Sequence, residues 1–227
     1  MITEEQVRES LEEVLVPGIR RSIAGLNLVR EVTFLLNRGV KVTLASAALS
    51  SGAQDWIKTK AKEVIKKLPE VNEIEIEFTE AKPAELNKIG HTLAVMSGKG
   101  GVGKSLVASL TAVALKRQGY EVGVLDADIT GPSIPKMFGI TERPTGSDTG
   151  ILPVLSRSGI EVMSINLLLP SEDDAVIWRG PLIGKTITQF GEDVLWGKLD
   201  YLVIDLPPGT ADAPLTVMQS FPISGVI

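Results

Sequence analysis

Residues 98–105, with the sequence GKGGVGKS, form a glycine-rich run that can hold the phosphates of a nucleotide. The run satisfies the pattern G-x-x-x-x-G-K-[ST], in which glycines let consecutive backbone N–H groups turn toward an anion. Lys104 can reach the β- and γ-phosphate oxygens, and the Ser105 hydroxyl can ligate Mg²⁺. We therefore predict a nucleotide-binding site made of Gly98, Lys99, Gly100, Gly101, Val102, Gly103, Lys104 and Ser105.

Three aspartates follow apolar runs further along the chain. Asp205 ends the run YLVID, where enzymes with such a loop need a carboxylate to hold magnesium directly or through water, so Ser105 and Asp205 are the predicted metal ligands. Asp126 and Asp128 follow EVGVL, at the edge of the expected sheet where such folds bind ligands. A carboxylate there can orient water for attack on the γ-phosphorus, although aspartates are also common turn formers.

Lys99 is a second lysine in the same loop. Phosphoryl transfer spreads negative charge over the γ-oxygens, and an added cation there is worth about 10³–10⁵ in rate. Because Lys99 lies near the start of the loop, it need not point at the nucleotide of its own subunit; the alternative is a solvated loop lysine. The predicted catalytic residues are Lys99, Lys104, Asp126 and Asp128.

Strands alternate with helices from residue 93 onward, which predicts a doubly wound α/β domain over residues 93–227. LAVMS precedes the loop as a strand, and residues 104–118 form a helix closed by Gly119. Three runs are apolar enough for the core of a mainly parallel sheet, and residues 181–196 are expected to be helical; the runs are EVGVLD, IEVMSI and YLVID. The final FPISGVI resembles the start of another strand, so we expect the domain to be incomplete at its C-terminal end.

The first 84 residues predict a small α+β domain. Apolar residues at helical spacing mark helices around residues 7–15 and 57–68, and strands are expected at VREVTFLL, VKVTLAS and EIEIEF. The polar stretch TEAKPAELNKIG contains a proline and ends in a glycine, so residues 85–92 are expected to be a linker.

The composition excludes several classes of protein. With 44% hydrophobic and 22% charged residues the chain is globular. A net charge of −5 and only 4% aromatic residues argue against a nucleic-acid partner. No apolar run is long enough for a membrane helix and the acidic start is unlike a signal peptide, so we expect no membrane partner and a cytoplasmic location. The absence of cysteine excludes disulfides and thiolate ligands within these residues.

GKGGVGKS resembles the deviant Walker A motif, whose early lysine reaches across a face-to-face dimer to the partner's nucleotide. Together with DADITGPSIP, WRGP and DYLVIDLPPGTAD, it makes residues 93–227 similar to the Mrp/ApbC family of iron–sulfur cluster carrier ATPases. LVPGIRRSIAGLNLVREV resembles the opening of the small iron–sulfur-assembly domain often fused ahead of that ATPase.

The resemblance implies an ATPase that uses Mg²⁺, acts as a homodimer sandwiching its nucleotides, and exchanges an iron–sulfur cluster with scaffold and recipient apoproteins. It implies that Lys99 acts in trans, that Asp126 orients water and Asp205 supports magnesium, and that Trp178 to Pro181 shape the dimer face. Family members carry a C-x-x-C near the carboxyl end, which this chain lacks, so it holds no iron–sulfur ligands of its own.

Two other functions share these motifs. A partitioning ATPase of the MinD/ParA type has the same loop, early lysine and aspartates, but it would use a membrane helix or a basic DNA-binding patch. A non-hydrolysing nucleotide switch would bind Mg-ATP without releasing phosphate. Of the three functions, we expect the chain to act as an iron–sulfur cluster carrier ATPase.

Overall fold

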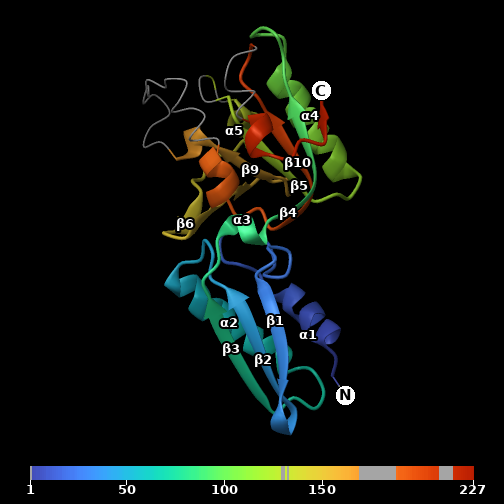
Figure 1. The fold of residues 1–227 in the computed structure, drawn as a ribbon, viewed down its shortest axis with the longest axis vertical. Coiled ribbons are helices and arrows are strands. Elements are labelled where there is room, and N and C mark those ends of the chain that lie inside the picture. The colour runs from blue at the N-terminus through green and yellow to red at the C-terminus, as the bar shows by residue number, and fades with distance from the viewer. Residues whose placement is uncertain (1, 129–130, 132, 169–187, 210–216) are drawn as a thin grey trace.

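The computed structural model describes residues 2–128, 131, 133–168, 188–209 and 217–227. They form two domains stacked end to end along the long axis, with the N-terminal domain at one end (Figure 1). The described parts contain no helix long and apolar enough to cross a membrane.

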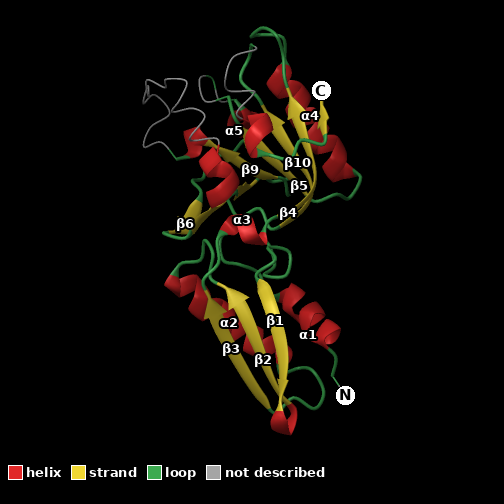
Figure 2. Cartoon of the chain, viewed as in Figure 1, coloured by secondary structure: helices red, strands yellow, loops and turns green. Residues whose placement is uncertain are grey.

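The small domain is a three-stranded sheet with helices packed against it (Figure 2). β1 (Val29–Leu35) is antiparallel to β2 (Gly39–Ala45), which is parallel to β3 (Glu73–Thr79). α1 (Glu4–Ser10) continues into the short η1 (Leu11–Glu13), and η2 (Leu36–Arg38) joins β1 to β2. α2 (Ser51–Ile65) begins where the Ser50 hydroxyl accepts a hydrogen bond from the Ala53 amide, and its buried face confirms the predicted pattern: Ile57, Ala61, Val64 and Ile65.

The large domain is built on a six-stranded sheet in the order β11-β4-β10-β5-β9-β8. All neighbours are parallel except β8, which is antiparallel to β9. The strands are β4 (Lys88–Val95), β5 (Val122–Asp126), β8 (Val154–Leu155), β9 (Glu161–Ser164), β10 (Lys198–Asp205) and β11 (Gly225–Val226). The predicted α/β class with a mainly parallel sheet is confirmed.

The remaining elements surround this sheet. They include α4 (Lys104–Arg117), α5 (Ile134–Met137), η3 (Ile165–Leu167) and a separate hairpin of β6 (Thr145–Ser147) and β7 (Gly150–Leu152). Only residues 188–193 of the expected helix over 181–196 are described as helical, and Trp196 lies beyond them, fully buried. The predicted dimer-face residues 178–181 lie outside the described residues.

Residues 85–92 are not the free linker that their polarity predicted. They contain the end of α3 (Pro83–Leu86) and the first half of β4, which pairs with β10 from Lys88 onward. Asn87 ties the junction together, because its side chain donates to the Val194 carbonyl at 2.9 Å and accepts from the Trp196 amide at 2.8 Å. The start of β4 is polar because its side chains are largely exposed, although its backbone belongs to the sheet.

Arg21 of the small domain joins the two domains electrostatically. Its guanidinium lies 2.5 Å from Glu161 on β9 and 3.1 Å from Glu121, and it donates to the Lys198 carbonyl at 3.0 Å. Leu152 and Leu195 of the large domain belong to the same buried cluster as the core of the small domain. Sequence reasoning missed this contact, because a charged residue in a loop shows no sign of a partner about a hundred residues away.

Replacing Arg21 with alanine should destabilise the fold more at pH 9 than at pH 6. Burial raises the pKa of Glu161 to about 8, although the Arg21 guanidinium favours the charged form. The folded chain thus holds this proton more tightly than the unfolded chain, and stability falls as the pH rises toward 8. Without Arg21 this pKa rises further, so the fall continues above pH 8 at about 1.4 kcal/mol per pH unit, which is the additional loss we expect at pH 9.

Urea unfolding of the wild type and of Arg21→Ala at both pH values measures this difference. The exposed Arg30→Ala is the matched control and should change stability equally little at pH 6 and 9. Glu161→Gln should remove the pH dependence that Arg21→Ala adds. An equal loss at both pH values would show that Arg21 acts through packing alone.

Candidate nucleotide-binding site

The glycine-rich loop lies between the end of β4 and the start of α4, the strand–loop–helix setting that the motif requires. Gly101 and Gly103 have φ values of +76° and +92°, in the left-handed region that favours glycine. Gly103 caps α4, so the free N–H groups and the positive end of this 14-residue helix adjoin the loop. The backbone therefore forms a site for an anion.

Lys104 is held between two carboxylates. Its Nζ lies 2.5 Å from Asp205 Oδ1 and 3.6 Å from Asp128 Oδ2, and the lysine is largely buried. The carboxyl end of β10 supplies Asp205, and the segment after β5 supplies Asp128. The structure thus brings three predicted site residues together from distant parts of the chain.

Asp205 has a carboxylate oxygen suited to a metal. Its Oδ2 is buried without a hydrogen-bond partner in the described parts of the chain. Burial raises the pKa of Asp205 above its ordinary value, although hydrogen bonds from Lys104 and Ser105 oppose the rise. A divalent cation at Oδ2 would satisfy this oxygen and favour the ionised carboxylate. Ser105 and Asp205 therefore fit the predicted magnesium site.

The rest of a magnesium shell would come from outside these side chains. Among the described residues, no three His, Cys, Asp or Glu side chains lie close enough together to hold a metal ion. Mg²⁺ commonly uses one or two protein ligands together with substrate phosphates and water, so the pair is sufficient.

Asp126 is fully buried behind Asp128 and binds backbone amides. Its Oδ1 accepts from the Asp128 amide at 3.2 Å, and its Oδ2 accepts from the amides of Ser133 and Ile134 at 3.0 and 3.1 Å. Burial, with the Asp205 charge adding to it, raises the pKa of Asp126 to about 7. Asp126 therefore fixes the start of α5, and Asp128 is the closer of the two aspartates to Lys104. The sequence had not indicated that the two aspartates have different partners, because both follow the same apolar run.

Residues 206–209 lie against the glycine-rich loop. The Leu206 amide donates to the Val95 carbonyl at 3.0 Å, and the Gly209 amide donates to the Ser97 carbonyl at 2.9 Å. These bonds bring Pro208 beside Gly100. The segment after Asp205 is therefore hydrogen-bonded to the residues that lead into the loop.

Lys99 lies on the exposed side of the loop. It has no ion-pair partner within the described residues, in contrast to Lys104. Its side chain is therefore accessible to groups outside this chain.

Ser164 is a site residue that the sequence analysis missed. It lies at the end of β9, fully buried, and its hydroxyl donates to Asp126 Oδ2 at 3.5 Å. The one signal was a hydroxyl inside the mainly apolar run IEVMSI, which alone does not indicate a contact with a neighbouring strand.

A parallel sheet with a glycine-rich loop between β4 and α4, and with aspartates at the ends of β5 and β10, defines a P-loop NTPase. The family model described as NUBPL iron-transfer P-loop NTPase matches residues 88–227, and the model described as iron-sulfur cluster assembly protein matches residues 4–78. The chain belongs to the NUBPL iron-transfer P-loop NTPase family, with an iron–sulfur-assembly-type domain at its N-terminal side.

Curated relatives bear the name iron-sulfur cluster carrier protein. The relative from Methanocaldococcus jannaschii is 54% identical over 63% of this chain and 50% of its own length. Those from Synechocystis and Bacillus subtilis are 36% and 38% identical over 100% and 98% of this chain, each over 67% of its own length. The matched region thus spans about half to two thirds of these relatives.

A solved structure also resembles the large domain. It is a nucleotide-binding protein from Archaeoglobus fulgidus in complex with ADP, 54% identical, with a TM-score of 0.54 over 62% of this chain and 54% of that one.

Proposed function

We propose that this chain binds and hydrolyses ATP with Mg²⁺ as part of an iron–sulfur cluster carrier that works as a homodimer. The observation that carries the proposal is the arrangement of Lys104 between Asp205 and Asp128 beside a glycine-rich loop at the start of α4. Such a cation beside an anion-binding backbone suits a polyphosphate. The family membership and the ADP bound to the Archaeoglobus fulgidus protein support a nucleotide as the ligand.

On binding, Lys104 would exchange its carboxylate partners for the β- and γ-phosphate oxygens. Ser105 and Asp205 would hold magnesium, which neutralises charge on the phosphates when it is bound. The segment carrying Asp126 and Asp128 would orient the attacking water, and the backbone of residues 98–103 would keep the γ-phosphoryl group in place. Lys99 would add its charge to the γ-oxygens of the nucleotide in a partner subunit.

The cargo role rests on the names of the relatives and on the two family models. Within the proposal, scaffold and recipient apoproteins are the partners and the cytoplasm is the location. The chain contains no cysteine, so within the proposal these residues supply no thiolate ligand to the cluster.

Phosphate release with Mg-ATP, combined with light scattering, tests the proposal. We expect steady release of phosphate and a doubling of mass with a non-hydrolysable ATP analogue. Nucleotide binding without phosphate release would favour the non-hydrolysing nucleotide switch. Retention by lipid vesicles or by DNA in the presence of ATP would favour a partitioning ATPase.

Asp126→Asn should leave Mg-ATP bound while lowering its hydrolysis by about 10²–10⁴-fold, because a neutral amide accepts a proton poorly from the attacking water. In the wild type, a water-orienting carboxylate works only when ionised. Since the pKa of Asp126 is raised to about 7, single-turnover hydrolysis should increase as the pH rises through about 7, and the variant should lose this step.

Asp55→Asn, an exposed change on α2, is the matched control and should hydrolyse ATP normally. Asp128→Asn separates the two aspartates. If it abolishes turnover while Asp126→Asn retains both turnover and pH dependence, water orientation belongs to Asp128, and Asp126 serves only to position its segment.

A further inference from the structure

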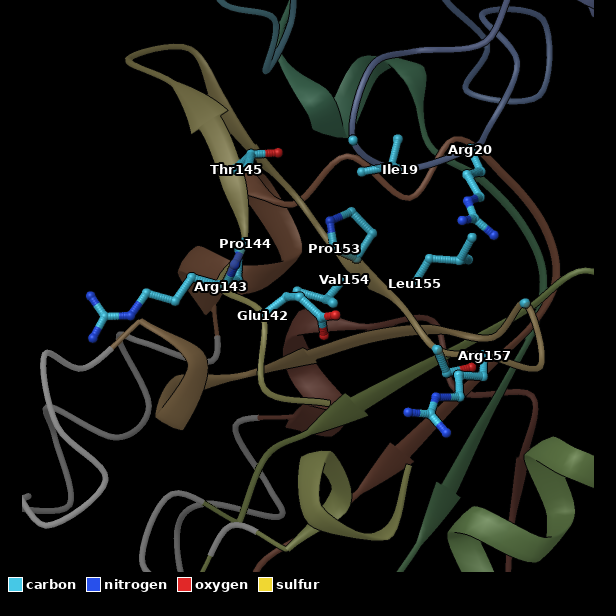
Figure 3. A pocket seen from close by; sticks show the side chains of 13 residues that line it. Ile19, Arg20, Glu142, Arg143, Pro144, Thr145, Pro153, Val154, Leu155 and Arg157 are labelled. Carbon is cyan, nitrogen blue, oxygen red and sulfur yellow. The ribbon is translucent and has the colours of Figure 1, made fainter. Parts of the chain in front are cut away.

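A pocket of about 420 Å³ lies at the junction of the two domains. None of the residues that line it belongs to the phosphate loop. Residues 18–20 of the small domain form one side, and residues 142–145 and 153–157 of the large domain form the others (Figure 3). Its walls are partly apolar, through Ile19, Pro153 and Leu155. Because both domains contribute, the pocket exists only in the joined chain.

The pocket has a positive side. Arg20 and Arg157 are both exposed, and neither has a carboxylate within ion-pair distance among the described residues. Figure 3 shows both on the same side of the pocket with Leu155 between them, whereas Arg143 points away and Glu142 lies beside Val154. In a chain with a net charge of −5, two guanidinium groups at the rim of a partly apolar hollow, without a carboxylate partner among the described residues, favour an organic ligand with carboxylates.

The same pocket runs along an open strand edge. β8 is the last strand of the six-stranded sheet and pairs with β9 alone among the described strands. The Ser156 amide donates toward β9, to the Ile160 carbonyl at 2.8 Å. Because backbone groups alternate along a strand, the amide and carbonyl of Leu155 point away from β9, and Leu155 is one of the residues that line the pocket. An extended peptide could pair with them.

Both arginines lie in backbone turns. Arg20 has a φ of +50°, a left-handed conformation that a non-glycine residue adopts at a cost, within a turn closed by the Val16 amide donating to the Arg21 carbonyl at 2.8 Å. Arg157 lies in a turn in which the Gly159 amide donates to the Ser156 carbonyl at 3.0 Å. The turns therefore fix where each arginine side chain begins.

We propose that this pocket binds an extended, acidic segment of a partner protein. Two of its carboxylates bind Arg20 and Arg157, its backbone pairs with Leu155, and an apolar side chain packs on Ile19 and Pro153. In an extended peptide, side chains two residues apart lie on the same side, so alternating acidic and apolar residues suit the two arginines and the apolar wall. An inorganic anion would use neither the wall nor the strand edge. This inference does not depend on ATP hydrolysis.

Fluorescence anisotropy with a labelled Glu-Val-Glu-Val-Glu peptide tests it, in low salt and with Mg-ADP present to occupy the phosphate loop. We expect saturable binding that weakens at least about tenfold in the double variant Arg20→Ala/Arg157→Ala. The control Arg30→Ala/Arg117→Ala removes the same charge from two exposed sites elsewhere and should bind normally. A Lys-Val-Lys-Val-Lys peptide should not bind.

Two further measurements distinguish an extended peptide from a small dicarboxylate. The same peptide with its central amide N-methylated should bind at least about tenfold more weakly, because it cannot pair with β8. Succinate should compete only at concentrations at least about a hundred times higher than the unlabelled peptide. Equal loss in both double variants, no saturable binding, or succinate as tight as the peptide would each overturn the proposal.

Discussion

Replacing Lys99 with alanine is expected to slow ATP hydrolysis by about 10³–10⁵-fold while Mg-ATP affinity stays the same. The reason is geometric. Lys104 is buried between Asp205 and Asp128 and, in the proposed dimer, would bind the nucleotide of its own subunit, whereas Lys99 is exposed on the same loop. A cation that is absent from the ground-state contacts but reaches the γ-oxygens during transfer changes the rate and not the affinity.

Mixing two inactive variants tests whether Lys99 acts on the partner's nucleotide. In a dimer of Lys99→Ala with Lys104→Ala, the site of the first subunit keeps Lys104 and receives Lys99 from the second. Random mixing should therefore restore roughly a quarter of wild-type turnover, because half the dimers are mixed and each has one complete site. If Lys99 acts within its own subunit, mixing restores nothing.

The control for this variant is the exposed lysine Lys58 on α2. Lys58→Ala removes the same charge and should leave turnover unchanged. Unchanged turnover in Lys99→Ala itself would show that Lys99 is a solvated loop lysine.

Lys104→Ala is expected to weaken Mg-ATP binding by about 10²–10⁴-fold, because it removes a buried cation that the phosphates would otherwise pair with. Isothermal titration calorimetry with the non-hydrolysable analogue measures the loss, again with Lys58→Ala as the control. Retained affinity would mean that the loop does not bind the phosphates.

The same variant leaves Asp205 buried without its cation, so its stability must be followed in parallel. Lys104→Gln keeps a long side chain that can donate a hydrogen bond to Asp205, and it should fold normally while still losing affinity. A melting temperature close to the wild type, together with weak binding, assigns the effect to the phosphate contact.

Local patterns in the sequence were enough to predict the phosphate loop and the elements on either side of it. The motif at residues 98–105 works through backbone geometry over a few residues, and the structure gives Gly101 and Gly103 the left-handed conformations that it implies. The apolar runs around β5, β9 and β10 likewise follow from burial on both faces of a sheet. Such features depend on neighbours in the chain, so they can be read from it.

Contacts between distant segments could not be predicted in this way. Residues 85–92 appeared to be a linker because the exposed side chains of β4 are polar, although its backbone pairs with β10 about a hundred residues later. The β6–β7 hairpin and the edge strand β8 are too short to produce a periodic pattern.

For the site, too, the sequence identified the residues and the structure determined which of them are in contact. Residue types and spacing identified Lys104, Asp126, Asp128 and Asp205 as a group. Only the order of strands in the sheet decided that Asp205 and Asp128 hold Lys104, and that Asp126 is buried behind them binding the amides of α5. Likewise, Arg21 pairs with Glu161 only because the two domains meet there. The same junction places Arg20 and Arg157 at one pocket. Ion pairs form only within about 4 Å, and the tertiary fold alone determines which charges come that close.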